Sequence, residues 1–333
     1  MQTILVTGGG GYIGSHAVRR LLKEGNTVVV LDNFSRGWRQ PLEILKKYGT
    51  LHVAEGDIVK KEDLKKIFQK YKFDCVMHFA ALCSVDESMK KPELYSKNNT
   101  FGTLKLLEAM LASGVEKLIF SSTCAVYGNA KYLPIDEKHP TFPRNPYGES
   151  KLMAEKTIEK FGKLHGFKYV ILRYFNVCGA DSEGEIGDSK KPSELLVQNA
   201  VRGALGIENF KLTCGKVDTP DGTPIRDYVD IDDLVEAHMK ALLYLNRNKP
   251  SQIINLGNGR GWSVKEIIDA VKEELEVDFT INKGEERQGE YKEVYADIKR
   301  AKSLLKFTPK KTLADSVKSL AKWYNRKPNG YEK

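Results

Sequence analysis

A strand, a glycine-rich turn and a helix follow one another within the first 24 residues of the chain. Thr3–Thr7 is an apolar run, Gly8, Gly11 and Gly14 come next, and His16–Glu24 has helical periodicity. Glycines at such a turn let a phosphate approach the bare backbone, and the helix start supplies free N–H groups and a partial positive charge. The pattern therefore predicts a cradle for the diphosphate of a dinucleotide.

An acid at the end of the next strand indicates which dinucleotide is bound. Thr27–Asp32 is typical of a strand, and Asp32 lies about twenty residues beyond the glycines. A carboxylate there accepts a hydrogen bond from a ribose 2′-hydroxyl and repels a 2′-phosphate, which favours NAD over NADP. The alternative is an ordinary turn acid, but the strand–turn–helix context favours cofactor binding.

Strands and helices alternate at short spacing through the first half of the chain, which is typical of parallel strands joined by crossover helices. We expect an α/β fold, a doubly wound parallel Rossmann sheet with a smaller C-terminal substrate-binding lobe. Residues 1–176 would form the NAD-binding domain, to which the chain returns around 226–258, and 177–333 would form the smaller lobe. The expected strands are Thr3–Thr7, Thr27–Asp32, Leu51–Asp57, Cys75–Ala81, Lys117–Ser122, Lys168–Arg173 and Gln252–Leu256, and the expected helices include Lys61–Tyr71, Ser96–Ala112, Tyr147–His165, Glu194–Leu205, Val264–Leu275 and Leu313–Tyr324.

Composition narrows the class of protein. Apolar residues make up 41% and charged residues 29% of the 333 residues, but no run reaches the eighteen or so apolar residues of a membrane span. The five cysteines are scattered and lack CxxC spacing, so we expect reduced thiols in the cytoplasm and no metal site. The net charge of +9 comes from lysines interleaved with glutamates, which indicates a solvated surface rather than a nucleic-acid site.

Three residues form a candidate catalytic group. Tyr147 and Lys151 lie one turn apart on an expected helix, so both side chains share a face. An ammonium beside a nicotinamide cation would lower the pKa of the phenol, and a phenolate can remove a proton from a sugar hydroxyl. Thr123 follows the end of an expected strand, where ligands of such sheets bind. The alternatives are a surface helix turn for the pair and a strand-terminal turn for Thr123.

With these residues in this order, the chain resembles the extended short-chain dehydrogenase/reductase family along nearly its whole length, and in particular its nucleotide-sugar epimerases. The stretches that carry the resemblance are residues 11–16, 78–81, 98–99, 145–148, 172–176, 221–228 and 255–259.

The resemblance implies a reversible oxidation at C4 of the sugar of UDP-glucose or UDP-galactose, with tightly held NAD. Tyr147 would take the proton of the 4-hydroxyl, Thr123 would bind the 4-oxygen, and Lys151 would hold the nicotinamide ribose. The NAD site would comprise Gly8, Gly11, Tyr12, Ile13, Gly14, Asp32, Asn33, Asp57, Ile58, Phe79, Ala80, Ala81, Asn98, Tyr147, Lys151 and Phe175. The nucleotide sugar would contact Thr123, Tyr147, Asn176, Leu195, Arg226, Arg287, Glu290 and Val294.

The chain departs from the family pattern at three positions that affect the choice of sugar. Cys83 stands where many glucose/galactose epimerases carry Lys, and Glu194 stands where Asn is common. Val294 occupies a position where a large aromatic residue excludes N-acetylated sugars in some members, so a pocket beside it would admit an acetamido group. The same three residues are similar to those of UDP-arabinose (UDP-xylose) 4-epimerases. UDP-N-acetylglucosamine and UDP-arabinose or UDP-xylose therefore remain alternative substrates.

Three other functions are alternatives to an epimerase. A net oxidoreductase shares the redox machinery and stays an alternative; it would require added NAD and would change the absorbance at 340 nm. A 4,6-dehydratase needs Asp-Glu after the catalytic Thr, whereas this chain has Cys124 and Ala125. A non-catalytic NAD-binding scaffold usually lacks the Tyr or the Lys, and both are present here. The resemblance also implies a homodimer built on helices 96–112 and 147–165, although an apolar stripe there is more often intramolecular core.

Overall fold

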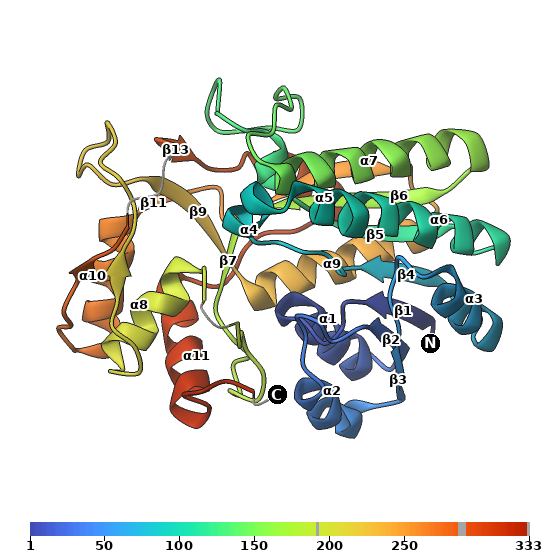
Figure 1. The fold of residues 1–333 in the computed structure, drawn as a ribbon, viewed down its shortest axis with the longest axis horizontal. Coiled ribbons are helices and arrows are strands. Elements are labelled where there is room, and N and C mark those ends of the chain that lie inside the picture. Colours follow the sequence, from blue (N-terminus) through green and yellow to red (C-terminus); the bar gives the residue numbers. More distant parts are fainter. Residues whose placement is uncertain (191–192, 286–290, 332–333) are drawn as a thin grey trace.

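The computed structural model describes residues 1–190, 193–285 and 291–331, and its centre is a seven-stranded parallel sheet (Figure 1). The strand order is β3-β2-β1-β4-β5-β6-β10, and each neighbouring pair is parallel. The order reverses between β1 and β4, which confirms the predicted doubly wound fold. The strands are β1 (Thr3–Thr7), β2 (Thr27–Asp32), β3 (Leu51–Glu55), β4 (Cys75–His78), β5 (Lys117–Thr123), β6 (Lys168–Tyr174) and β10 (Gln252–Leu256).

Two strands end earlier than their sequences suggest. The expected strands 51–57 and 75–81 end at Glu55 and His78, because the following residues turn into the wall of a cavity at this edge of the sheet.

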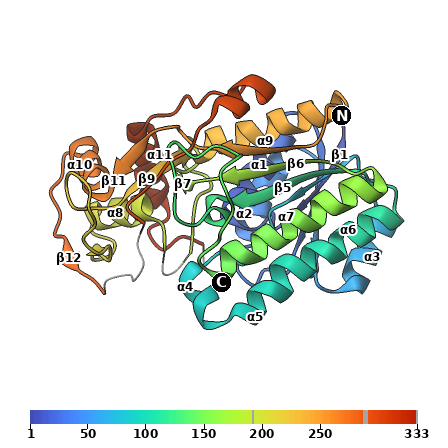
Figure 2. The same cartoon turned by 90° about the horizontal axis from the view of Figure 1, so that it is seen from above.

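Helices cover both faces of the sheet. One face packs against α1 (Tyr12–Lys23), α2 (Gln40–Leu45) and α9 (Ile231–Asn246), and the other against α3 (Lys61–Lys70), α6 (Gly102–Ala112) and α7 (Pro146–His165). Figure 2 shows α6 and α7 side by side along that second face.

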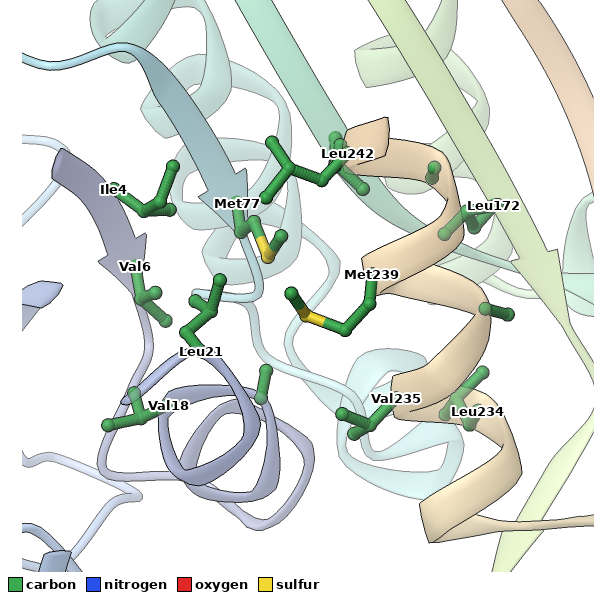
Figure 3. Close-up of a cluster of buried hydrophobic side chains, with 14 of the residues drawn as sticks. Ile4, Val6, Val18, Leu21, Met77, Leu172, Leu234, Val235, Met239 and Leu242 are labelled. Carbon is green, nitrogen blue, oxygen red and sulfur yellow. The ribbon is translucent and has the colours of Figure 1, made fainter. Parts of the chain in front are cut away.

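Successive side chains of β1 point to opposite faces of the sheet, so this strand contributes to two hydrophobic clusters. Ile4 and Val6 face the cluster with α1 and α9, whereas Leu5 faces the opposite cluster, because successive side chains of a strand point to opposite faces. Figure 3 shows Leu21 of α1 and Met239 of α9 meeting in the first cluster. Burying a side chain of this size contributes about 1.5–3 kcal/mol.

Local sequence sets the ends of α7, the helix that carries Tyr147 and Lys151. The Asn145 side chain accepts a hydrogen bond from the Gly148 N–H at 2.8 Å, and Pro146 occupies the first turn. The helix ends at Gly166, which has a φ of 75° in the left-handed region.

A second group of elements forms the left side of the molecule in Figure 1. Strand β9 (Ile225–Asp230) pairs with β7 (Asn176–Cys178), β11 (Gly261–Ser263) and β13 (Glu293–Val294), and β8 (Lys211–Leu212) pairs with β12 (Asn282–Lys283). Helices α8 (Leu196–Ala204), α10 (Val264–Leu275) and α11 (Leu313–Arg326) share a hydrophobic cluster. The remaining short helices and helical turns are α4 (Val85–Lys90), α5 (Pro92–Tyr95), η1 (Lys46–Tyr48), η2 (Ser96–Phe101), η3 (Cys124–Val126) and η4 (Ala301–Leu305).

Within the described ranges, no helix combines the length and the apolar character that crossing a bilayer requires.

Candidate active site

A cavity of about 870 Å³ lies at the carboxyl ends of the sheet strands, where the strand order reverses. Its walls come from the turns after β1, β2, β3 and β4, the end of β5, the start of α7, and residues 189–190 of the loop before α8. The predicted site residues that line it are Gly8, Gly11, Tyr12, Ile13, Gly14, Asp32, Asn33, Asp57, Ile58, Phe79, Ala80, Ala81, Asn98, Tyr147 and Lys151. Residues between positions 8 and 151, which are distant in the sequence, thus line a single cavity.

The glycine turn has room for a ligand only because its residues lack side chains. Gly8 has a φ of 75°, and a Cβ there would lie 2.6 Å from the backbone N of Ala80. A Cβ on Gly14 would lie 2.1 Å from the Gly8 carbonyl oxygen. Helix α1 begins after Gly11 with no side chain capping its N–H groups, which therefore stay available to an anion.

Asp32 holds the turn as well as facing the cavity. Its carboxylate accepts hydrogen bonds from the N–H groups of Gly10 and Phe34, each at 2.8 Å. Burial raises the pKa of Asp32, and these two bonds act in the opposite direction. Arg36, which also lines the cavity, is paired with Glu87 at 2.6 Å, so its charge is compensated within the protein.

These features fit a dinucleotide. The cavity lies within the range of 300–1,000 Å³ usual for cofactor sites, its glycine turn supplies an anion cradle, and its acid suits a ribose hydroxyl. The groups that line the cavity therefore fit NAD.

The three predicted catalytic residues lie together on β5 and α7. Lys151 is 3% exposed, and its ammonium donates a hydrogen bond to the Ser121 carbonyl oxygen at 2.7 Å. The Thr123 hydroxyl accepts a hydrogen bond from the Ala125 N–H at 3.1 Å and lies close to the Tyr147 phenol. Thr123 itself is not among the residues that line the cavity, so it adjoins the site through Tyr147.

The pKa values of this pair differ from the simple expectation. Burial raises the pKa of Tyr147 well above its usual value, with further contributions from Cys83 and Tyr174, and only partial opposition from Thr123. Burial also lowers the pKa of Lys151 to about 8. The predicted lowering of the phenol pKa is therefore not produced by the side chains alone, because the Lys151 ammonium is directed to a backbone oxygen.

A smaller cavity of about 150 Å³ contains three predicted substrate residues, Asn176, Leu195 and Arg226. The Asn176 amide donates to the Asp227 carbonyl oxygen at 3.2 Å, and an Arg226 N–H donates to the Ile225 carbonyl oxygen at 2.9 Å. Glu194 lines both cavities, so the two spaces adjoin at this residue.

Besides Thr123, two predicted residues of the described ranges line neither cavity. Phe175 and Val294 are 4% and 5% exposed and pack in one hydrophobic cluster with Tyr127 and Ile135. Arg287 and Glu290 lie outside the described residues.

The sequence did not single out several residues that shape the site. Asn99, which is 2% exposed, bonds both backbone groups of Leu82 at 2.9 Å and the Ser150 hydroxyl at 3.0 Å. It thereby ties the loop after β4 to α7, whereas its neighbour Asn98 faces the cavity. Nothing in an Asn-Asn pair indicates which amide faces in. Other cavity residues that were not predicted are Ser35, Arg36, Gly37, Trp38, Ser121, Tyr174, Ser189, Lys190 and Tyr331.

Comparison with known proteins defines the class. Residues 4–257 match the NAD dependent epimerase/dehydratase family, and the chain belongs to this family. NAD is accordingly its cofactor, in agreement with the sequence prediction.

Individual relatives are similar over nearly the full length. A UDP-glucose 4-epimerase of Lactobacillus helveticus is 43% identical over 331 residues, which cover 99% of each chain. A putative UDP-arabinose 4-epimerase 2 of Arabidopsis thaliana is 43% identical over 341 residues, covering 98% of this chain and 81% of the relative. The structure of UDP-glucose 4-epimerase from Bifidobacterium longum in complex with NAD+ and UDP superposes with a TM-score of 0.94, at 34% identity, and covers 99% of this chain and 100% of that chain.

Proposed function

We propose that the protein interconverts UDP-glucose and UDP-galactose by inverting C4 of the sugar while it keeps NAD bound. The observation that carries the proposal is the position of Tyr147, Lys151 and Thr123 beside the cavity that also contains the glycine turn. The names of the relatives from L. helveticus and B. longum support the choice of hexoses. Residues 1–176 and 226–258 would bind NAD, and the rest of 177–333 would bind the nucleotide sugar.

Three side chains have separate roles in the reaction at C4 of the sugar. Tyr147 accepts the proton of the 4-hydroxyl and later returns it, Thr123 positions the phenol and the 4-oxygen, and Lys151 orients the ribose of the cofactor. When bound, NAD supplies the hydride acceptor for C4 and a positive ring that favours the phenolate. Lys151 is buried and Tyr147 is half-buried, which limits the access of water to the proton shared by tyrosine and sugar.

A chromatographic assay without added NAD tests the proposal. UDP-galactose, UDP-N-acetylgalactosamine and UDP-arabinose are offered separately to the purified protein. Conversion of UDP-galactose to UDP-glucose is expected, with no net change in absorbance at 340 nm. Failure to convert UDP-galactose, even after NAD is supplied, would refute the proposal.

Tyr147→Phe tests the assigned base. We expect kcat to fall about 10²–10⁴-fold, the range for loss of a general acid–base group, while NAD content stays at the wild-type level. Tyr132→Phe is the matched control, because Tyr132 is 44% exposed and lines neither cavity. Full activity in Tyr147→Phe would remove Tyr147 from the mechanism.

A pentose is the second candidate substrate. The Arabidopsis relative named as a putative UDP-arabinose 4-epimerase is as similar in sequence as the L. helveticus relative. We propose UDP-arabinose and UDP-xylose as the alternative pair. UDP-N-acetylglucosamine is a third candidate from the resemblance alone, since Val294 replaces the large aromatic residue that excludes N-acetylated sugars in some members but itself lines neither cavity. A higher kcat/KM for UDP-arabinose than for UDP-galactose would favour the pentose.

We also propose a cytoplasmic homodimer. All five cysteines are free, which suits a reducing compartment. On the α6–α7 side, Phe101, Leu111 and Met153 are 44%, 42% and 49% exposed and provide apolar surface for a second copy. Leu107, from the predicted stripe, is instead buried in the core of one chain. Light scattering is expected to give about twice the 37.5 kDa of one chain.

A further inference from the structure

A lysine from the loop before α8 lines the larger cavity. The Lys190 ammonium donates a hydrogen bond to the Cys83 sulfur at 2.8 Å, and both residues line the 870 Å³ cavity together with Tyr147 and Lys151. Cys83 lies close enough to Tyr147 to contribute to its raised pKa. The ammonium therefore lies near the reacting end of the site.

The backbone around Lys190 is anchored. The Trp323 indole N–H donates to the Asp188 carbonyl oxygen at 3.0 Å, and the Tyr331 N–H donates to the Ser189 hydroxyl at 2.6 Å. Asp188 and Ser189 are 1% and 6% exposed. The cation is thus presented from a fixed position rather than from a loose surface loop.

The surroundings of Lys190 keep its ammonium protonated but leave some of its hydrogen-bond donors unused. Burial disfavours the ammonium, yet Cys83, Asp188 and Glu194 outweigh burial and raise the pKa of Lys190. Within residues 1–190, 193–285 and 291–331, the bond to Cys83 is the hydrogen bond that the ammonium makes, and no carboxylate forms an ion pair with it. An ammonium has three donors, so two remain for a ligand.

The neighbouring acid explains why a cation is needed here. Glu194 lines both cavities, and its carboxylate accepts a hydrogen bond from the Ser84 hydroxyl at 2.5 Å. An uncompensated carboxylate at this junction would repel the diphosphate of a nucleotide sugar that spans the two spaces. A cation beside it offsets that repulsion and adds charge-assisted hydrogen bonds.

From this geometry we propose that Lys190, which lines the larger cavity beside Cys83, binds the diphosphate of a nucleotide sugar that spans the two cavities. This inference rests on the proposed function. The diphosphate of the dinucleotide is the other source of the same chemistry, but the glycine turn and the start of α1 already provide its cradle.

Binding of UDP to the NAD-loaded protein, measured by isothermal titration calorimetry, tests the proposal. Lys190→Gln is expected to weaken UDP about tenfold, the usual effect of losing one hydrogen bond to a charged group. Uridine, which has no phosphate, is expected to bind both proteins equally. Lys302→Gln, at an exposed lysine that lines neither cavity, is the matched control and is expected to bind UDP as the wild type does.

Moving the charge separates an electrostatic role from a structural one. Because the Cys83 sulfur lies 2.8 Å from the Lys190 nitrogen, a lysine at position 83 can place its ammonium in the same region. Cys83→Lys in the Lys190→Gln background is expected to restore UDP affinity to within about threefold of wild type.

Three results would overturn the inference. They are an unchanged UDP affinity in Lys190→Gln, an equal loss for UDP and uridine, and loss of NAD with UDP affinity retained, which would assign the ammonium to the dinucleotide. The assay does not depend on turnover. A wild-type protein that binds UDP but converts no UDP-sugar would refute the proposed function and leave the role of Lys190 standing.

Discussion

A buried ion pair directly behind the catalytic strand gives the most quantitative prediction. Glu155 of α7 and Arg173 of β6 have side chains that are 0% and 5% exposed. The Arg173 Nε lies 3.0 and 3.2 Å from the two Glu155 oxygens, and its Nη2 lies 2.5 Å from Oε2. Glu155 also accepts from the Ser122 hydroxyl, one residue before Thr123.

The change is Glu155→Gln. An amide keeps the shape of the side chain but removes its charge, which leaves the Arg173 guanidinium buried without compensation. Breaking a buried pair in this way costs about 3–5 kcal/mol. That is a large fraction of a total stability of about 5–15 kcal/mol.

The assay is equilibrium unfolding in urea at a fixed, saturating concentration of NAD, because a ligand that binds only the folded state shifts the apparent stability. Glu55→Gln is the matched control. Glu55 pairs with Arg39 on the surface, where the side chains are 62% and 54% exposed, so the same substitution should cost less than about 1 kcal/mol.

The double variant Glu155→Met, Arg173→Met completes the test. Removing both charges avoids an unpaired ion, so we expect the double variant to be more stable than Glu155→Met alone and than Arg173→Met alone, by at least about 2 kcal/mol in each case. If the loss in free energy of unfolding of the double variant equalled the sum of the losses of the two single variants, the reasoning would be refuted, because the two charges would then not compensate each other.

Three further predictions follow from the site and the core. Gly14→Ala is expected to abolish retention of NAD during purification, since its Cβ would lie 2.1 Å from the Gly8 oxygen; a full complement of bound NAD would contradict this. Burial lowers the pKa values of His16, His78 and His238 from 6.5 to about 4, 3 and 4. The unfolded chain therefore binds more protons at these histidines between those values and 6.5, so their contribution to stability is full above pH 6.5 and is lost toward pH 4, by up to about 4 kcal/mol per pH unit. The pKa values of Asp227 and Asp230, which burial raises to about 6 and 7, oppose part of this loss. His238→Phe, beside Phe79, should reduce the loss of urea resistance between pH 7.5 and 5, and an unchanged slope would show that His238 does not contribute.

The doubly wound sheet was predictable because its signals are local. Each strand is a short apolar run, and the order of strands and helices along the chain restricts the topology to few choices. The limits of Thr3–Thr7 and Thr27–Asp32 agree with β1 and β2. Strand and helix ends were less accurate, as for α8, which begins at Leu196 rather than Glu194, because ends depend on the contacts of the neighbouring loops.

The candidate site was partly predictable for the same reason. Residues directly after parallel strands meet at one edge of the sheet, so the glycine turn and Asp32 could be placed together from the sequence. Residues predicted from the resemblance alone are divided: Asp57 and Asn98, for example, line the cavity, whereas Phe175 and Val294 do not. Phe175 and Val294 lie in a hydrophobic cluster, and whether an apolar side chain lines a cavity or packs behind it depends on a few degrees of backbone rotation.

The sequence by itself determined the elements whose cause lies within a few residues: the glycine turn after β1, the spacing of Tyr147 and Lys151 on one helix face, and the cap that starts α7 at Asn145. Only the tertiary structure decided which distant groups meet. It directs Lys151 to the Ser121 carbonyl, pairs Glu155 with Arg173, and brings Lys190 to Cys83 across 107 residues. Such contacts depend on how layers of the fold pack, and burial in those layers sets the pKa values on which the chemistry depends.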